Sequence, residues 1–494
     1  MAKTKLQIAH VASEVEPFSK TGGLADVASS LPRAIKQLGH KVIVITPLYQ
    51  GFVDTKKYNL KLIAEKVKID LRDDLFAEAN FWQGELTKGV PVYFIENNKY
   101  FGERKSLYGS LHENARFFFF DLAALQLLRT INFQPDLIQC HDWHTGLIPH
   151  FIKGRFKREN FFSKTATLFT IHNLLFQLGH DWWKIRGRLR DDGYSRLPRF
   201  DEEQKVERIN FAKRAIINAD LINTVSEQYA EEILTKDFGQ TLHRILQNRK
   251  KRLFGIINGI DYKDYNPKTD PDIYCNYDLN SLPKKAENKK WLQKYFGLPQ
   301  NPDVPLLGMV TRIAEQKGFD LLMPIMEDVL RLDLQFVIMG AGDKNYENFF
   351  KKVQKKHPKK IALHLEFDTK KPTAVYAGTD MFLMPSRFEP CGLGQLISLR
   401  YGSIPIVRAV GGLVDTVTDF NPRTKKGNGF IFQNYSSKAL LISITRAVEN
   451  YQYQEIWQNL VKKSMEKSFS WEIPAKKYLL LYRKAIKQKR TNLN

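Results

Sequence analysis

The chain has 494 residues, more than one hydrophobic core of ordinary size can organise, so we expect two domains. Its formal net charge of +23 suggests a nucleic acid, a membrane surface or an anionic ligand as partner, or simply solvated lysine-rich helix faces. No apolar run is long enough to span a membrane, no signal-peptide pattern opens the sequence, and the three cysteines are too widely spaced to indicate a disulfide framework or a zinc site. These features predict a soluble, cytoplasmic protein.

The N-terminal region is predicted to form a strand, a helix and a second strand. Residues 6–11 form the first strand, and after the loop Lys20-Thr21-Gly22-Gly23 apolar residues recur at helical spacing until Gly39. Residues 41–46 form the next strand. The three-glycine fingerprint of dinucleotide-binding folds is absent after the first strand, so a dinucleotide is not indicated.

Residues 60–95 alternate between apolar and polar, which is typical of strands at a sheet edge, with Gly84 and Gly89-Val90-Pro91 as turns. We find no residues with a chemical role in this segment. We expect it to be structural.

Polar clusters follow two further apolar strands. Residues 136–140 run into His141-Asp142-Trp143-His144, and residues 167–171 run into His172. Open α/β sheets bind ligands at the carboxyl ends of their strands, so these clusters favour a shared site over separate structural roles. A metal at His141 and His144 would need a third ligand, which is not evident, and the spacing is not a usual zinc arrangement.

The first domain is predicted to end near residue 258. The polar segment that follows Asn266-Pro267, to about residue 290, is the best linker candidate. Residues 306–310 form the first strand beyond it. Arg312 and Lys317 follow that strand, where two cations suit a diphosphate; the alternative is that they pair with carboxylates of the protein itself.

Residues 381–417 contain two strand-loop-helix units in close succession. Glu389 lies in the first turn between strand and helix, and Gly411-Gly412 opens the second helix. Helix N-termini bind phosphate through unpaired N–H groups and the helix dipole, so this stretch predicts an anion site. Glu389 is then either a capping carboxylate or the group that holds the neutral part of a phosphate-bearing ligand, such as sugar hydroxyls.

The string Ser386-Arg387-Phe388-Glu389-Pro390-Cys391-Gly392-Leu393 resembles the signature of bacterial glycogen synthases and plant starch synthases, which are retaining glycosyltransferases of the two-domain GT-B fold. Lys20-Thr21-Gly22-Gly23-Leu24 matches the N-terminal motif of the same family, and the similarity extends from near residue 6 to near residue 480. The resemblance implies an α/β protein with two Rossmann-like, doubly wound domains that face a central cleft.

The family pattern also implies domain limits. Residues 1–258 correspond to the N-terminal acceptor (glucan) domain and residues 259–470 to the C-terminal nucleotide-sugar domain. Residues 471–494 correspond to a C-terminal helix that crosses back to the N-terminal domain, followed by a basic tail. Within the first domain, residues 209–226 and 229–233 are similar to the family's closing helix and strand.

The resemblance assigns roles residue by residue. The family's catalytic positions fall on Lys20, Asp142, His172 and Glu389. Its nucleotide-sugar contacts fall on Lys20, Gly22, Gly23, Arg312, Lys317, Phe367, Cys391, Gly392, Leu393, Gly411 and Gly412. For Lys20 the alternative is an exposed loop lysine. The sequence departs from the pattern at Leu178, where the family has glycine, and at Thr373-Ala374, where relatives often have His-Arg.

We therefore expect a glycogen (starch) synthase that transfers glucose from ADP-glucose to the non-reducing end of an α-1,4-glucan with retention. Leaving-group assistance by the diphosphate fits these residues better than a double displacement with two carboxylates. We expect no cofactor and no metal, because Asp270-Pro271-Asp272 consists of turn-forming residues away from the phosphate site. We also expect no nucleic-acid or membrane partner.

Two alternatives remain at this stage. A glucan-binding protein without activity would not need to keep phosphate-handling residues, and a nucleic-acid-binding protein would show strongly salt-dependent affinity. The sequence decides neither ADP-glucose against UDP-glucose nor the oligomeric state.

Overall fold

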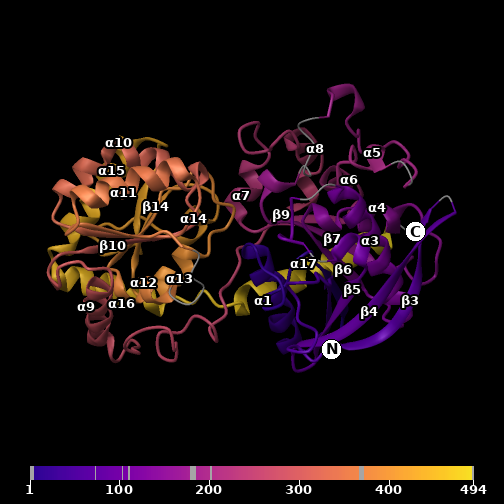
Figure 1. The fold of residues 1–494 in the computed structure, drawn as a ribbon, viewed down its shortest axis with the longest axis horizontal. Coiled ribbons are helices and arrows are strands. Elements are labelled where there is room, and N and C mark those ends of the chain that lie inside the picture. Colours follow the sequence, from indigo (N-terminus) through magenta and orange to yellow (C-terminus); the bar gives the residue numbers. More distant parts are fainter. Residues whose placement is uncertain are drawn as a thin grey trace. The chain divides into compact units, whose positions relative to one another are not determined.

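The computed structural model describes residues 5–72, 74–102, 104–109, 112–177, 185–200, 203–366 and 372–491 (Figure 1). Contacts between residues divide the chain into two compact units. The first unit is Met1–Asn258 with Trp471–Asn494, and the second unit is Gly259–Ser470. The described cysteines are all free. None of the described helices is both long and apolar enough to cross a membrane.

The first unit is built on a nine-stranded sheet in the order β3-β4-β5-β2-β1-β6-β7-β8-β9. The strands are β1 (Gln7–Val11), β2 (Lys41–Pro47), β3 (Lys61–Arg72), β4 (Leu75–Thr87), β5 (Val90–Glu96), β6 (Leu137–His141), β7 (Ala166–Ile171), β8 (Leu221–Thr224) and β9 (Leu253–Gly255). The pairs from β5 to β9 are parallel, and β3 and β4 add an antiparallel edge. Strand order reverses between β1 and β6, and such a switch point is where doubly wound sheets bind ligands.

Helices cover both faces of this sheet. They are α1 (Gly23–Gln37), α2 (Asn98–Phe101), α3 (Glu113–Thr130), α4 (Leu147–Lys153), α5 (Glu203–Val206), α6 (Phe211–Asn218), α7 (Glu227–Glu232), α8 (His243–Asn248) and α17 (Glu472–Thr491). One core packs against α3, which carries four consecutive buried phenylalanines, and the other packs under α1 and α17. In Figure 1, α17 lies along the first unit close to α1. The last helix of the chain thus completes the first unit.

The second unit is a six-stranded parallel sheet in the order β12-β11-β10-β13-β14-β15. Its strands are β10 (Leu306–Val310), β11 (Gln335–Met339), β12 (Ile361–His364), β13 (Met381–Met384), β14 (Ile404–Arg408) and β15 (Phe430–Phe432). Its helices are α9 (Lys285–Tyr295), α10 (Phe319–Arg331), α11 (Lys344–Lys356), α12 (Pro372–Gly378), α13 (Gly394–Arg400), α14 (Gly412–Thr416), α15 (Ser437–Tyr451) and α16 (Gln454–Glu466). Figure 1 shows α10, α11 and α15 on one side of the sheet and α9, α12, α13 and α16 on the other. The switch point of this unit lies between β10 and β13.

Two local predictions are wrong, the turn at Gly84 and the strand at residues 229–233. Gly84 lies inside β4 and not in a turn; a Cβ there would come within 2.5 Å of a terminal methyl group of Leu60, so a larger residue would require the Leu60 side chain to move. Residues 229–233 lie mainly in α7, whose N-cap Ser226 accepts from the N–H of Tyr229, and the strand is β8.

The predicted linker is part of the second unit. Within residues 259–284, Tyr277 is buried and its hydroxyl donates to the carbonyl of Tyr401 at 2.7 Å. The carboxylate of Asp270 accepts from the Tyr401 hydroxyl at 2.5 Å. The segment is therefore anchored to the second unit through the buried side chains of Asp270 and Tyr277.

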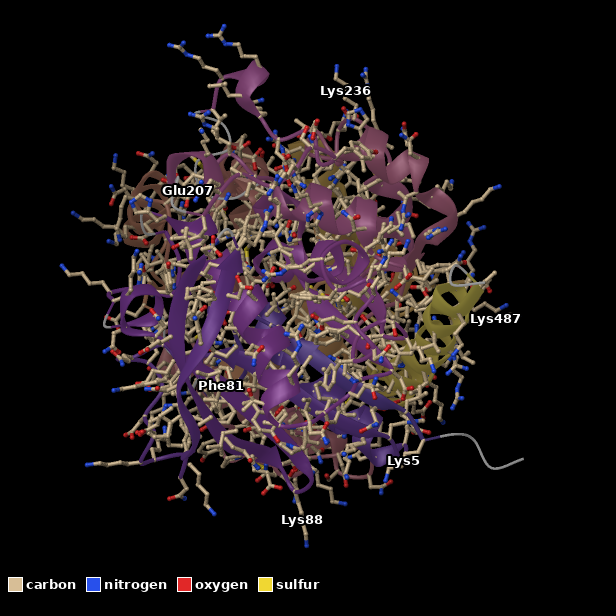
Figure 2. All side chains as sticks on the ribbon, turned by 90° about the vertical axis from the view of Figure 1, so that its right-hand side faces the viewer. Lys5, Phe81, Lys88, Glu207, Lys236 and Lys487 are labelled. Carbon is tan, nitrogen blue, oxygen red and sulfur yellow. The ribbon has the colours of Figure 1, made fainter. Side chains whose placement is uncertain are left out.

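Positively charged side chains point outward from several parts of the first unit (Figure 2). Figure 2 shows Lys5, Lys88, Lys236 and Lys487 pointing outward from well-separated segments, while the labelled Phe81 is fully buried. Scattered lysines of this kind are typical of solvated surfaces.

Candidate active site

Asp142 joins the loops that follow β6 and β7. Its Oδ1 accepts the backbone N–H of His172 at 2.8 Å and the side-chain amide of Gln177 at 2.6 Å. The Gln177 carbonyl oxygen in turn accepts the N–H of Trp143 at 2.9 Å. Burial raises the pKa of Asp142 to about 7, against the opposing effect of these hydrogen bonds. The structure therefore brings two predicted site residues, Asp142 and His172, into direct contact.

His172 is one end of a row of three buried imidazoles. Its Nε2 lies 2.9 Å from Nδ1 of His141, and Nε2 of His141 lies 3.1 Å from Nδ1 of His10. Burial lowers the pKa of His10 and of His172 to about 3, so these rings are neutral at pH 7. Sequence reasoning missed His10, because it lies in the middle of an apolar strand with no polar neighbour to single it out.

Glu14 is a second residue that sequence reasoning missed. It is buried just after β1, and its Oε2 accepts the N–H of Thr21 at 2.5 Å and the Thr21 hydroxyl at 2.8 Å. Burial raises the pKa of Glu14 to about 7, and its charge contributes to the raised pKa of Asp142. The position of Glu14, three residues beyond the end of a strand at the switch point, could have indicated in the sequence that it belongs to the site.

Lys20 lies next to the N-terminus of α1. Its ammonium is half-exposed and lies 2.7 Å from Oδ1 of Asp26 and 3.6 Å from Oε2 of Glu16. Gly22 caps α1 with an extended backbone that any residue adopts, and a Cβ there would meet nothing within 4 Å. Neither the backbone conformation nor the packing requires glycine at position 22. Because glycine has no side chain, the N-terminus of α1 and Gly23 remain accessible.

The structure separates His144 from His141. The His144 ring packs against Trp143, Tyr108 and Phe117 and not against another ligand-type side chain. The described residues contain no group of three or more His, Cys, Asp or Glu side chains arranged to hold a metal ion.

In the second unit, Lys317 and Glu389 are in contact. Nζ of Lys317 lies 2.6 Å from Oε2 of Glu389, and the hydroxyl of Ser386 donates to the same oxygen at 3.0 Å. Oε1 of Glu389 has no protein partner within the described ranges. The loops after β10 and β13, at the switch point, are therefore joined through one carboxylate oxygen, while the other remains available.

Two groups of residues predicted to contact the nucleotide sugar, Gly411-Gly412 and Gly392-Leu393, differ in their surroundings. Gly412 donates its N–H to the carbonyls of Glu389 and Pro390, each at 3.2 Å, and a Cβ at Gly411 would come within 2.0 Å of the Glu389 carbonyl. These glycines fit the second loop against the first. At the start of α13, by contrast, Gly392 and Leu393 are half-buried, and their N–H groups have no protein acceptor among the described residues.

The other predicted contacts lie nearby or outside the described residues. Arg312 is exposed at the carboxyl end of β10, and Cys391 is buried beside Gly412. Phe367 lies outside the described residues, as does Leu178. Arg387 and Arg408, which sequence reasoning did not select, both lie over the ring of Tyr435 and bring two more cations to the strand ends.

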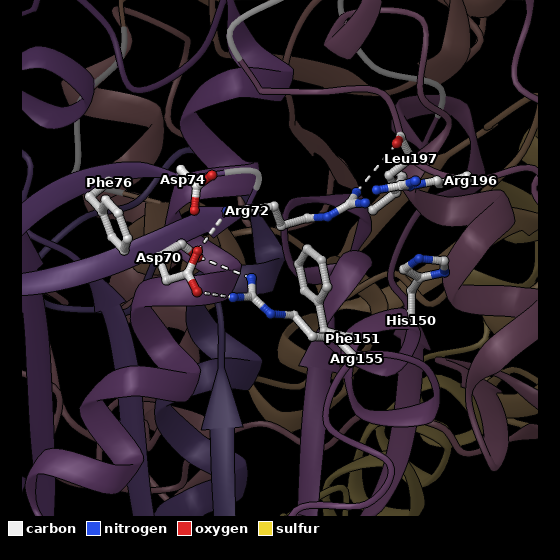
Figure 3. Close-up of a pocket in the computed structure, with 9 residues that line it drawn as sticks. All are labelled: Asp70, Arg72, Asp74, Phe76, His150, Phe151, Arg155, Arg196 and Leu197. Atoms are coloured by element: carbon white, nitrogen blue, oxygen red, sulfur yellow. Dashed lines mark hydrogen bonds and ion pairs between the residues drawn. The ribbon is translucent and has the colours of Figure 1, made fainter.

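A separate pocket of about 470 Å³ lies in the first unit between the β3–β4 hairpin and α4 (Figure 3). An ion pair between Arg155 and Asp70 crosses it, and Arg72 donates to the carbonyl of Leu197 at 3.3 Å. It contains none of the predicted site residues.

Comparisons with known proteins agree with this geometry. Residues 7–248 match the family model of the starch synthase catalytic domain, and residues 293–464 match that of group 1 glycosyl transferases. The catalytic domain of starch synthase IV from Arabidopsis thaliana, solved bound to ADP and acarbose, superposes with a TM-score of 0.86 at 32% identity, over 98% of this chain and 100% of that one. Sucrose-phosphate synthase from Thermosynechococcus elongatus shares the fold, with a TM-score of 0.60 at 17% identity over 97% and 99% of the two chains. The protein is a glycosyltransferase of the GT-B class.

Curated relatives define the family more closely. The chain is 44% identical to the glycogen synthase of Fervidobacterium nodosum over 97% of its length and 99% of that protein, and 41% identical to that of Thermosipho melanesiensis over 98% and 100%. The chain belongs to the glycogen synthase family.

Proposed function

We propose that this glycogen synthase transfers glucose from ADP-glucose to the non-reducing end of an α-1,4-glucan with retention of configuration. The observation that carries the proposal is the contact between Lys317 and Glu389 at the switch point of the second unit. A starch synthase solved with bound ADP has the same fold at 32% identity, which supports an adenine nucleotide as the donor's leaving group.

We assign the donor to the second unit. Arg312, Lys317 and the open N–H groups of Gly392 and Leu393 would hold the diphosphate, since cations and helix N-termini stabilise phosphate charge. Charge accumulates on the diphosphate as its bond to glucose breaks, so the same groups lower the transition-state free energy. Glu389, held through Oε2, would accept hydroxyls of the glucose through Oε1.

We assign the acceptor to the first unit. Asp142 and His172 present a carboxylate and an imidazole at adjoining strand ends, and Lys20 with Gly22 and Gly23 adds a cation and an accessible helix N-terminus. Among the carboxylates of the described residues we assign Glu389 alone to the glucose of the donor. We therefore infer that the leaving diphosphate accepts the proton of the attacking hydroxyl and that no glycosyl-enzyme forms.

We further propose that the reaction takes place in the cytoplasm without nucleic acid, membrane or metal. The three free cysteines fit a reducing compartment, and the lysines are dispersed.

The test is glucosyl transfer by the purified protein. Glycogen is incubated with radiolabelled ADP-glucose or UDP-glucose at matched concentrations, and the label in precipitated glucan is counted after digestion by an α-1,4-specific amylase. We expect faster transfer from ADP-glucose into amylase-sensitive product. Faster transfer from UDP-glucose would overturn the donor assignment, and no transfer from either would overturn the proposed reaction.

A further inference from the structure

The row of histidines lies on one face of the first unit's sheet. Because side chains alternate along a strand, His10 and His141 continue the face that packs under α17, and the loop after β7 adds His172 to the row. Neighbouring rings are nearly coplanar, with interplanar angles of 23° and 28° and centroids 5.4 and 5.2 Å apart. Their nitrogens therefore face each other in the ring planes, as hydrogen bonds require.

The polar groups around His10 are already paired. Tyr482 of α17 lies edge-on to the ring at 6.4 Å between centroids, and its hydroxyl donates to Oε1 of Gln139. The Gln139 amide donates to the hydroxyl of Thr170 at 2.8 Å, which donates to Asn223. Nε2 of His10 is buried without a partner among the described residues.

Neutral imidazole carries a single N–H, so only two arrangements of protons satisfy both hydrogen bonds in the row. In the first, His10 donates from Nδ1 to His141, and His141 donates from Nδ1 to His172. In the second, every proton lies on Nε2 and both bonds run the other way. Other arrangements need a His141 that is protonated on both nitrogens, an imidazolium, or on neither, an imidazolate.

The two arrangements differ at the ends of the row. The first leaves a buried acceptor at Nε2 of His10, whereas the second leaves a buried N–H there. Unpaired N–H groups in protein interiors are rarer than under-satisfied acceptors, which favours the first. In that arrangement Nδ1 of His172, which has no protein partner within the described ranges, is an N–H donor.

We propose that His10 is a positioning residue: acting through His141, it fixes His172 as the Nδ1–H tautomer and so presents an N–H donor at the strand-end site. This inference rests on the proposed function only in that the donor would meet a sugar hydroxyl. His10 itself touches no substrate.

Two measurements test the proposal. First, ¹⁵N spectra of protein labelled at histidine, assigned with a His172→Gln variant, report which nitrogen of His172 is protonated. We expect Nδ1 at neutral pH, and protonation at Nε2 would overturn the proposal. This measurement does not depend on glucosyl transfer, so a protein without transfer activity would refute the proposed function and leave this inference to be decided by the spectrum.

Second, a matched pair of variants separates hydrogen bonding from packing. In His10→Asn the side-chain amide can still donate from the δ position, and His10→Leu has a similar shape without a donor. We expect His10→Leu to give a mixture of His172 tautomers and to lower kcat about ten- to a hundred-fold, the scale of a misplaced active-site group, with the ADP-glucose KM within about twofold. We expect His10→Asn to retain the tautomer and most of kcat.

Ile8→Val is the stability control, because it thins the same core without touching the row. Equal losses in His10→Asn and His10→Leu would mean a packing role and overturn the proposal, as would an unchanged His172 tautomer in His10→Leu. If His10→Leu does not fold, the wild-type spectrum and the His10→Asn variant test the proposal. Loss of the Nδ1–H tautomer of His172 in His10→Asn would then overturn the proposal.

Discussion

Lys317 and Glu389 share a contact of 2.6 Å between Nζ and Oε2, although 72 residues separate them in the sequence. The two side chains come from the loops that follow β10 and β13, the two strands that flank the switch point of the second unit. Glu389 is thereby held by one oxygen, with Ser386 as second donor, and the lysine that would bind phosphate also orients the carboxylate that would bind sugar. The contact couples the two halves of the donor site, and it predicts different consequences for the removal of each partner.

We expect Glu389→Ala to lower kcat by about a hundredfold or more, because an electrostatic contact to the transferred sugar is lost. ADP affinity should stay within a few fold, since Lys317 remains and is no longer engaged by a carboxylate. Steady-state rates and ADP titration calorimetry measure both. Glu315→Gln, which alters an exposed carboxylate paired with Arg387, is the matched control and should be near normal. Loss of ADP affinity equal to the loss of kcat would instead give Glu389 a structural role.

Lys317→Met should weaken ADP binding by about 10- to 100-fold, the value of one hydrogen bond to a charged group. It should also lower kcat, because Glu389 loses the cation that orients it. Lys344→Met removes an exposed lysine that pairs with Glu347 and serves as the control. Unchanged ADP affinity in Lys317→Met would show that the phosphates bind elsewhere.

Asp142 and Glu14 should make the first unit less stable as pH rises from 5 to 8. Both have a pKa near 7 in the folded protein, above their values in the unfolded chain, because burial disfavours the charged form. Between those values the native state binds more protons than the unfolded state, so the free energy of unfolding falls with rising pH.

The variant Asp142→Asn isolates the contribution of Asp142 to the pH dependence of stability. The buried histidines also contribute to that pH dependence, but their contributions cancel when the variant is compared with wild type. Urea unfolding should show that the stability of Asp142→Asn relative to wild type improves by roughly 2 kcal/mol between pH 5 and pH 8. A relative stability that does not change with pH would mean that Asp142 is already ionised at pH 5.

Much of this arrangement could be predicted because strands and motifs are local. The strand predicted at residues 306–310 has the same bounds in the structure, and residues 381–417 contain the predicted strand-loop-helix units, with Glu389 in the loop after β13. The contact of Lys317 with Glu389 and the row that begins at His10 could not be predicted. Both depend on which strands are neighbours, and sheet order is not written in the spacing of any single segment.

The burial of Asp270 illustrates the same limit. The segment around Asp270 was predicted to be a linker because of its polar and turn-forming residues. In the structure Asp270 is buried, and its carboxylate accepts the Tyr401 hydroxyl and the N–H of Asp272 within the second unit.

The last prediction concerns metal. The proposed diphosphate site already has Arg312, Lys317 and open N–H groups, so a divalent cation would add positive charge where it is already supplied. We expect full activity in excess EDTA. Loss of transfer in EDTA that manganese or magnesium restores would contradict this scheme.

The two residues of the Asp-x-Asp pair should be substituted separately, because Asp270 has a structural role. Its carboxylate accepts from the buried hydroxyl of Tyr401 and from the N–H of Asp272 at 2.8 Å. Asp270→Ala should lower the free energy of unfolding by about 1.5–3 kcal/mol, because the hydrogen bond between the Asp270 carboxylate and the Tyr401 hydroxyl is lost. The folded fraction of this variant should still transfer glucose in EDTA. Asp272→Ala, whose side chain is exposed, should change neither stability nor activity; a metal-dependent fall in kcat for Asp272→Ala would show that the pair binds a catalytic cation.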